Sequence, residues 1–425
     1  MRQVSAQVII CFEAFNKEDI WVAFRDSSYK TILDECGKGV IEVPDSLPSG
    51  YAVLYGPRKI YNFYLMPGTR QSMKIHSNGH LDFNGAGKEI NEYLNGKSIN
   101  NPGLSYDQPE DEFLKQWEQM LVRLQDHLDS LSLPKTFKFV EHKRLHYWAC
   151  NMLQAYPLYR ARRLNTKWYA PKDDYYRRME RAMKEDMDAY ELWEYRKAFE
   201  NYIWSFAKKI AGNQPLEQLR EALMHINQSV SDPRLTEYLV HAVMYQHVRN
   251  YGAEGVDKFL PVYEEKVRDS VRKADFDKLY QKHCRLAKGR KAPNFRLSDI
   301  NGNWVSLSSL LGKYVFIDLW ATWCMPCCKE LPFMQQMEER YKGKPIQFIG
   351  ISIDNDEAAW RRKVKADNLK GLQLHVDRES TFRDDYQISF IPRFMLINPE
   401  GKIVDVKLSR PSDPATMEFL DALLE

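Results

Sequence analysis

The sequence lacks any apolar run long enough to cross a membrane. Hydrophobic residues make up 44% of the 425 residues, yet polar or charged residues interrupt every apolar stretch. A membrane-spanning helix needs about 20 consecutive apolar residues, so we predict no transmembrane segment. The apolar run Val8–Phe12 is also too short for the hydrophobic part of a secretion signal. We therefore expect either a cytosolic protein or one whose targeting segment is absent from this sequence.

A large excess of one charge is also missing. Lysine and arginine number 61, and aspartate and glutamate number 58, which leaves a net charge of +3. Nucleic-acid binding usually depends on concentrated positive charge. Residues 159–181 are rich in arginine and tyrosine, but acidic residues interrupt them. We interpret this stretch as solvated helix faces over an aromatic core and predict no nucleic-acid partner, while docking of a protein partner there stays open.

The seven cysteines do not form the even set that a disulfide-stapled scaffold requires. We interpret the four solitary ones as small buried apolar residues. These are Cys11, Cys36, Cys150 and Cys284.

Histidines are too few and too isolated for a metal site. His142 and His146 stand four apart on one expected helix, and His241 and His247 lie on another. Zinc needs three or four ligands at suitable spacing, and no carboxylate or cysteine accompanies either pair convincingly. We predict neither a metal nor a cofactor.

The chain is too long for one ordinary core, and its pattern changes along its length. Residues 1–95 alternate between short apolar runs and turn residues, which predicts an all-β, sandwich-like domain. Residues 105–285 show helical periodicity and form an expected all-α domain. The basic run Arg285–Lys291 resembles a linker, and residues 286–425 form the expected third, α/β domain. The helices expected in the middle domain cover residues 114–133, 137–156, 173–211, 216–229, 233–251 and 256–285.

A dithiol motif gives the strongest functional signal. Cys324 and Cys327 enclose Met325 and Pro326, and the motif follows the apolar run Lys313–Trp320 and opens an amphipathic helix. This order of strand, turn and helix is typical of a redox-active C-x-x-C. Cys324 is expected at the helix N-terminus, where free N–H groups favour a negative sulfur, so we predict it as the nucleophile. Cys327 is then the less exposed resolving thiol.

Three segments resemble the thioredoxin superfamily, and most closely its TlpA/ResA-like branch of extracytoplasmic thiol-disulfide oxidoreductases. They are GRKAPNFRLSDING at 289–302, WATWCMPCCKELP at 320–332 and ISFIPRFMLINPEG at 388–401. The segments around 61–94 resemble, more loosely, a β domain found ahead of thioredoxin modules in Bacteroidetes envelope proteins. The resemblance implies a thioredoxin-like fold for 286–425 and a location in the periplasm or cell envelope.

The resemblance also implies roles for residues around the dithiol. Asp318 occupies the position of a buried aspartate in thioredoxin, and Glu330 that of a glutamate on which many TlpA/ResA-like proteins rely. Either acid is a candidate acceptor for the proton of Cys327, and the sequence leaves both open.

Pro392 matches the cis-proline of the fold, and Ile391 before it is expected to pair with an extended substrate segment. Arg393 stands where threonine is usual in the family. Trp323, Met325 and Pro326 complete the expected substrate surface.

The C-terminal region has three other possible interpretations. Cys324 and Cys328 have the spacing of Sco-like copper proteins, with His375 as a further ligand, but one helical residue turns Cys328 about 100° from Cys327. A peroxiredoxin-type site lacks its proline, and its threonine is at the wrong distance from the cysteine. A non-enzymatic envelope protein that binds partners and keeps the thioredoxin module as a scaffold is the alternative function.

The motifs together favour a protein-disulfide oxidoreductase that exchanges disulfides with partner proteins. Its expected partners are proteins that carry disulfides or dithiols, and an upstream redox partner. The direction of the exchange depends on a reduction potential that the sequence does not specify.

Overall fold

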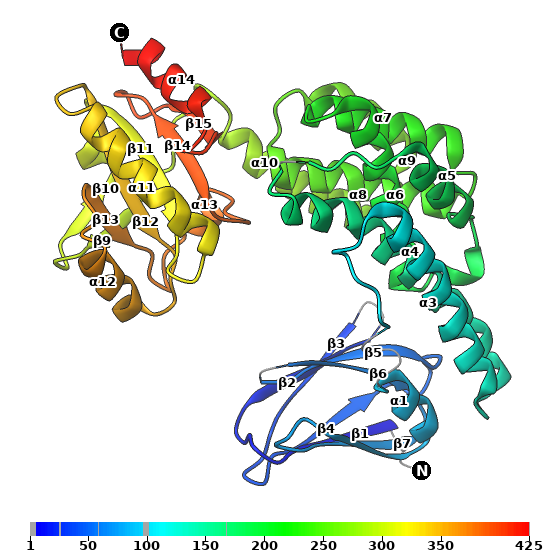
Figure 1. The fold of residues 1–425 in the computed structure, drawn as a ribbon. Helices are drawn as coiled ribbons and strands as arrows, with labels where there is room; N and C mark the ends of the chain where they lie inside the picture. The colour runs from blue at the N-terminus through cyan, green and yellow to red at the C-terminus, as the bar shows by residue number, and fades with distance from the viewer. Residues whose placement is uncertain (1–5, 25–26, 58, 97–101, 167, 425) are drawn as a thin grey trace. The chain divides into compact units, whose positions relative to one another are not determined.

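The computed structural model describes residues 6–24, 27–57, 59–96, 102–166 and 168–424 (Figure 1). The chain divides into two compact units, Met1–Asn201 and Tyr202–Glu425. The first holds the β-strands of the N-terminal part and the first long helices, and the second holds further helices and an α/β domain. The domain boundaries at 1–95, 105–285 and 286–425 remain a prediction.

The N-terminal strands form two four-stranded sheets. One has the order β4 (Lys38–Val43), β1 (Ala6–Phe12), β7 (Arg70–Ile75), β8 (Leu81–Gly85), and the other β3 (Ser27–Ile32), β2 (Asp19–Phe24), β5 (Gly50–Tyr55), β6 (Ile60–Leu65). Every second residue of β4 and of β6 is buried, as expected for a strand with one face on the core. Side chains from both sheets share one apolar core. The sandwich-like all-β fold is confirmed.

A buried carboxylate joins this sandwich to the first helices. Glu141 lies on α4 (Lys135–Arg163) and is fully buried. It accepts hydrogen bonds from Tyr93 at 3.0 Å and from Tyr51 of β5. Arg144 holds the same carboxylate through two guanidinium nitrogens at 2.7 and 2.8 Å. A buried charge is tolerated when it is paired and hydrogen-bonded in this way.

Together with α4, the described helices between the sandwich and the α/β domain form an all-α region, as predicted. They are α3 (Glu110–Ser130), α5 (Asp173–Ala182), α6 (Trp193–Ala211), α7 (Pro215–Ser229), α8 (Pro233–Tyr251), α9 (Leu260–Lys266) and α10 (Ser270–Arg285). Helix α1 (Lys88–Leu94) instead contacts β6 and β8 of the sandwich. No helix among the described residues is long and apolar enough to cross a membrane.

Three helix boundaries were predicted wrongly. Helix α4 does not end before Pro157, because the carbonyl of Leu153, which a proline cannot engage, accepts a hydrogen bond from Tyr175 instead at 2.9 Å. The expected helix 173–211 is interrupted between α5 and α6, where a short 3-10 helix spans Met187–Ala189. The expected helix 256–285 breaks at Asp269, whose carboxylate accepts hydrogen bonds from the first N–H groups of α10.

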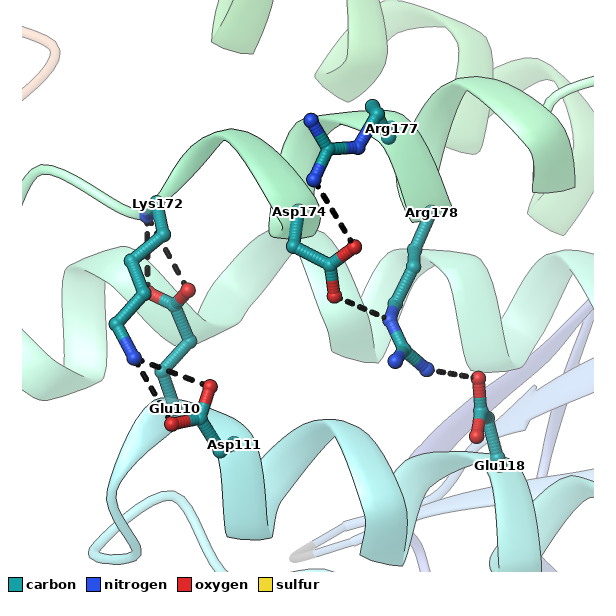
Figure 2. Close-up of polar contacts among 7 residues, drawn as sticks. All are labelled: Glu110, Asp111, Glu118, Lys172, Asp174, Arg177 and Arg178. Carbon is teal, nitrogen blue, oxygen red and sulfur yellow. Dashed lines mark hydrogen bonds and ion pairs between the residues drawn. The ribbon is translucent and has the colours of Figure 1, made fainter.

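The arginine-rich stretch of α5 is balanced by acidic neighbours (Figure 2). Arg178 lies between Asp174, at 2.8 Å, and Glu118 of α3. Lys172 contacts Asp111 at 2.8 Å. Surface ion pairs of this kind add little stability each, but they neutralise the positive charge that the sequence concentrates here.

The C-terminal α/β domain contains a seven-stranded mixed sheet. Its order is β10 (Trp304–Ser306), β9 (Arg296–Asp299), β13 (Leu372–His375), β12 (Ile346–Ser352), β11 (Tyr314–Trp320), β14 (Arg393–Ile397), β15 (Ile403–Leu408). Its helices are α11 (Met325–Arg340), α12 (Glu357–Ala366), α13 (Phe382–Asp385) and α14 (Pro414–Leu424). Separate apolar cores include Met334 of α11 with Leu420 of α14, and Trp360 of α12. This is the α/β fold that the thioredoxin resemblance implies.

The segment predicted as a linker is bound to this domain. Leu286 is buried in its core, and the amide of Gly289 donates to the carbonyl of Ile403 at 2.8 Å. Ile403 in turn donates to Arg290, and Ala292 donates to Gly401. The basic side chains suggested a linker, but the backbone of these residues pairs with the start of β15.

Candidate active site

The two cysteines of the motif are joined at the start of a helix. Cys324 is the N-cap residue of α11 and forms a disulfide with Cys327, with their Cα atoms 5.3 Å apart. The amide of Cys327 donates a hydrogen bond to Sγ of Cys324 at 3.2 Å. Cys324 is 5% exposed and Cys327 is 1% exposed. The first sulfur is therefore the one next to the free N–H groups of the helix start.

Exposed apolar side chains stand next to the dithiol along the chain and next to the cis-proline. Trp323 is 67% exposed and Met325 is 69% exposed, and Pro326 is also exposed. Phe390, just ahead of the Ile391–Pro392 pair, is another large exposed apolar side chain. Exposed apolar side chains gathered around a reactive group are typical of a binding surface.

Asp318 lies in the middle of β11 and is 2% exposed. Burial raises the pKa of its carboxyl to about 8, and the negative charges of Glu330 and Glu338 act in the same direction. No described residue hydrogen-bonds its Oδ1 atom. A buried carboxyl with a free oxygen and a raised pKa suits proton transfer near neutral pH.

Glu330 is also buried, on the second turn of α11, but its oxygens are occupied. Ser412 donates to them through its amide at 3.0 Å and its hydroxyl at 2.9 Å, and Arg410 lies 3.6 Å away. Glu330 is therefore a buried and paired acid rather than an ordinary solvated helix residue. Its contacts join α11 to the segment between β15 and α14.

The Ile391–Pro392 peptide bond is cis, as the resemblance implies. Arg393, the next residue, pairs with Leu319 in the ladder of β14 and β11. Pro392 therefore lies at the end of β11 from which the dithiol loop leaves. Ile391 and Pro392 are half-buried, and Arg393 is buried, with its guanidinium donating to the carbonyls of Val406 and Gln387.

Asp354 was not identified from the sequence, although it holds the loop that carries Cys324. Its carboxylate accepts hydrogen bonds from the amide of Thr322 at 2.9 Å and from the hydroxyls of Thr322 and Ser352, both at 2.7 Å. The acid follows β12 at the same sheet edge where β11 ends. This edge position was the only sequence signal for its role.

The other residues considered as metal ligands each have a different contact. Cys328 is half-buried near the carbonyl of Thr322, at 3.8 Å from Sγ, whereas Nε2 of His375 bonds to the carbonyl of Asp354. His142 pairs with Asp129, and His146 bonds to a backbone carbonyl. Within the described ranges, no group of three histidine, cysteine or acidic residues is placed to hold a metal ion.

The chain resembles known proteins over this domain. A model of the AhpC/TSA family matches residues 288–406. The thiol-disulfide oxidoreductase ResA of Bacillus subtilis (strain 168) is 31% identical over 138 residues, which are 32% of this chain and 76% of that protein. ResA of Bacillus cereus (strain ZK / E33L) is 36% identical over 117 residues, covering 28% of this chain and 67% of that protein.

Solved structures with likeness to this chain include two from Bacteroides vulgatus. A crystal structure of a putative thiol-disulfide oxidoreductase from Bacteroides vulgatus is 33% identical, covers 33% of this chain and 99% of that one, and has a TM-score of 0.32. A solution structure from the same species is 50% identical over 31% of this chain and 86% of that one, with a TM-score of 0.30.

The activity named for the relatives is consistent with the residues found at the site. The matched region contains the dithiol, the buried aspartate and the cis-proline, and the aligned relatives are named thiol-disulfide oxidoreductases. The thioredoxin-like α/β domain thus carries a protein-disulfide oxidoreductase activity. The chain belongs, through this C-terminal domain, to the ResA-like thiol-disulfide oxidoreductases.

Proposed function

We propose that this protein exchanges disulfides with partner proteins through Cys324 and Cys327. The observation that carries the proposal is the position of Cys324 as the N-cap of α11, with the amide of Cys327 directed at its sulfur. The helix N-terminus stabilises a thiolate there, and a thiolate is the attacking species in disulfide exchange.

The proposed exchange runs in two steps when a partner disulfide is reduced. The Cys324 thiolate attacks one sulfur of the partner disulfide, forms a mixed disulfide and releases the other partner sulfur as a thiolate. Cys327 then loses its proton and attacks Cys324, which forms the Cys324–Cys327 disulfide and releases the second partner thiolate. The partner gains two electrons, the dithiol loses two, and the released thiolates take protons from solvent. Oxidation of a partner is the reverse sequence.

We assign the base for Cys327 to Asp318. Its free oxygen and raised pKa support this role, whereas the oxygens of Glu330 are engaged by Ser412 and Arg410. Glu330 then positions α11 against the segment that follows β15.

The substrate surface that we propose consists of Trp323, Met325 and Pro326 beside the dithiol, with Ile391 and Pro392 next to it. The exposed side chains would contact apolar partner residues, and the backbone at Ile391 would pair with an extended partner segment. A dithiol or disulfide protein as substrate, an upstream redox partner and a location in the cell envelope follow from the family resemblance.

Trapping of partners tests the proposal. Cys327→Ser should accumulate mixed disulfides with partner proteins, because the captured partner cannot be released, and Cys324→Ser should not. The adducts are read on non-reducing gels after acid quench, with reduction as the reversal control. Equal trapping by both variants would overturn the assignment of the nucleophile, and no adduct with either would favour a scaffold role.

A further inference from the structure

A small cavity lies between α11 and the sheet, and its position follows from the register of three strands. Asp318 of β11 lies opposite Gly350 of β12, and Gly350 lies opposite Gln373 of β13. Residues at the same register position point to the same face of a sheet. Because Gly350 has no side chain, a space of about 10 Å³ remains between the polar groups of Asp318 and Gln373.

Helix α11 closes this space with a second carboxyl. Leu331, Met334 and Glu338 line it from the helix, and Lys370 lies at its rim. Glu338 follows Cys327 by eleven residues, which is close to three helical turns, so both lie on the same face of α11. This spacing was the sequence signal for Glu338.

The cavity presents unsatisfied acceptors. Oδ1 of Asp318, Oε2 of Glu338 and Oε1 of Gln373 are buried, and none has a hydrogen-bond partner among the described residues. A space of about 10 Å³ with two to four polar neighbours suits a single water. Such a water can donate to two of these oxygens and thereby connect the two carboxyls.

Glu338 reaches from this cavity to the surface. Its side chain is only half-buried, although Oε2 is enclosed. Gly371 makes room for the carboxyl, since a Cβ there would lie 2.6 Å from Oε1 of Glu338. Exposed Lys370 is the charged group that faces it from the segment before β13, and Asp318 and Gln373 face it from the sheet.

We propose that Glu338 is the exit for the proton of Cys327: Asp318 takes the proton from the thiol, a water in the cavity passes it to Glu338, and Glu338 releases it to solvent beside Lys370. Glu338 is thus a positioning residue that acts through Asp318. This rests on the proposed function, because it presupposes that Cys327 resolves a mixed disulfide. No bond other than O–H and S–H bonds changes in the relay.

The titration of the two acids supports the direction of transfer. Burial raises the pKa of Glu338 to about 7, with Lys370 acting in the opposite direction, and the pKa of Asp318 is raised to about 8. The two carboxyls therefore have similar affinities for a proton. Transfer from Asp318 through one water to Glu338 costs little free energy.

The test separates proton escape from chemistry. Reduced protein is held at about pH 5.5 or at about pH 8.5 and then mixed with glutathione disulfide at a final pH of about 8.5, where resolution needs a deprotonated base. Formation of the Cys324–Cys327 disulfide is followed by acid quench and mass spectrometry. In the wild type both starting conditions should give the same rate.

Glu338→Gln should react about tenfold more slowly from the acid start than from the alkaline start, since Asp318 cannot lose its proton quickly. Glu338→Asp should restore most of the rate. Gly350→Ala, which fills the cavity, should reproduce the defect. Glu339→Gln, a neutralised exposed glutamate one residue further on the same helix, serves as the matched control and should behave as wild type.

The outcomes distinguish the two proposals. A wild type that forms no intramolecular disulfide with glutathione disulfide from either start would overturn the proposed function, and the relay with it. A normal wild type with equal rates from both starts in Glu338→Gln would overturn the relay alone. A loss that is equal from both starts would also overturn it, because a packing defect does not depend on the earlier pH.

Discussion

Asp318 places an ionisable group where water cannot solvate it. Folding therefore favours the protonated form, and the pKa of this carboxyl is raised to about 8. The carboxyl is therefore mostly protonated at neutral pH and ionises as the pH rises through about 8. A base of this kind is matched to its task near neutral pH, at the expense of stability at higher pH.

The free energy of unfolding should therefore depend on pH. Between about pH 4, the ordinary value for aspartate, and about pH 8, the folded state of the oxidised protein binds the proton more tightly than the unfolded state, so the free energy of unfolding falls as pH rises. Asp318→Asn removes this dependence. We expect the variant to gain about 3–5 kcal/mol relative to wild type between the two ends of that range. Urea unfolding, followed by hydrogen exchange in β11, measures the gain. A difference that does not vary with pH would contradict it.

The two buried acids should also separate kinetically. Asp318→Asn should slow resolution of the mixed disulfide by about 10²–10⁴ near neutral pH, with the loss shrinking as alkali ionises Cys327 unaided. Glu330→Gln should have a much smaller effect, because its oxygens are already bound by Ser412 and Arg410. Stopped-flow rates across pH check both variants. If both variants lost the same fraction of the resolution rate at every pH, neither acid would be the base and both would have structural roles.

At the scale of elements, the active-site loop depends on the end of β12. Asp354 accepts three hydrogen bonds from Thr322 and Ser352, and it thereby fixes the turn that leads into Cys324. The dithiol is therefore held both by its own helix and by the neighbouring strand.

Removing this carboxylate should loosen the turn. Asp354→Ala leaves buried donors unpaired, so we expect a loss of about 1.5–3 kcal/mol in the free energy of unfolding, with a smaller loss for Asp354→Asn. Faster hydrogen exchange of residues 320–324 should accompany it. Protection at wild-type level in the alanine variant would show that the hydrogen bonds do not hold the loop.

Strand and helix types were predictable because burial imposes periods of two and 3.6 residues. Local signals failed where a distant partner intervened. Pro157 reads as a helix end, but Tyr175 satisfies the carbonyl that the proline leaves free, and α4 continues. At the site, the motif and the family resemblance indicated Cys324, Cys327 and Asp318. Asp354 and Glu338 carry only weak sequence signals, and their roles depend on strand register and helix packing.

At the scale of the whole molecule, the α/β domain begins earlier than its first strand. Leu286 is in its core, and residues 289–292 pair with residues 401–403. The residues just before the first strand are therefore part of the folded domain.

A fragment of residues 286–425 should fold alone and retain exchange on a generic disulfide, because it keeps its complete sheet and core. A fragment that starts at residue 293 loses Leu286 and these backbone bonds, and it should be less stable by a few kcal/mol, on the order of one buried leucine. Circular dichroism and a dithiol exchange assay compare the two. A folded but inactive 286–425 fragment would mean that the helical region contributes to the site.

The carboxylate of Glu141 has a mechanical consequence for the other unit. Two tyrosines from the sandwich part and one arginine from its own helix meet on it. Swinging the sandwich away from α4 would strip this charge of its hydroxyl donors, at about 1–3 kcal/mol for each group left unpaired. The sandwich and α4 should thus move together as one rigid body. A force applied to the strands is then transmitted to α4 rather than bending the connection between them.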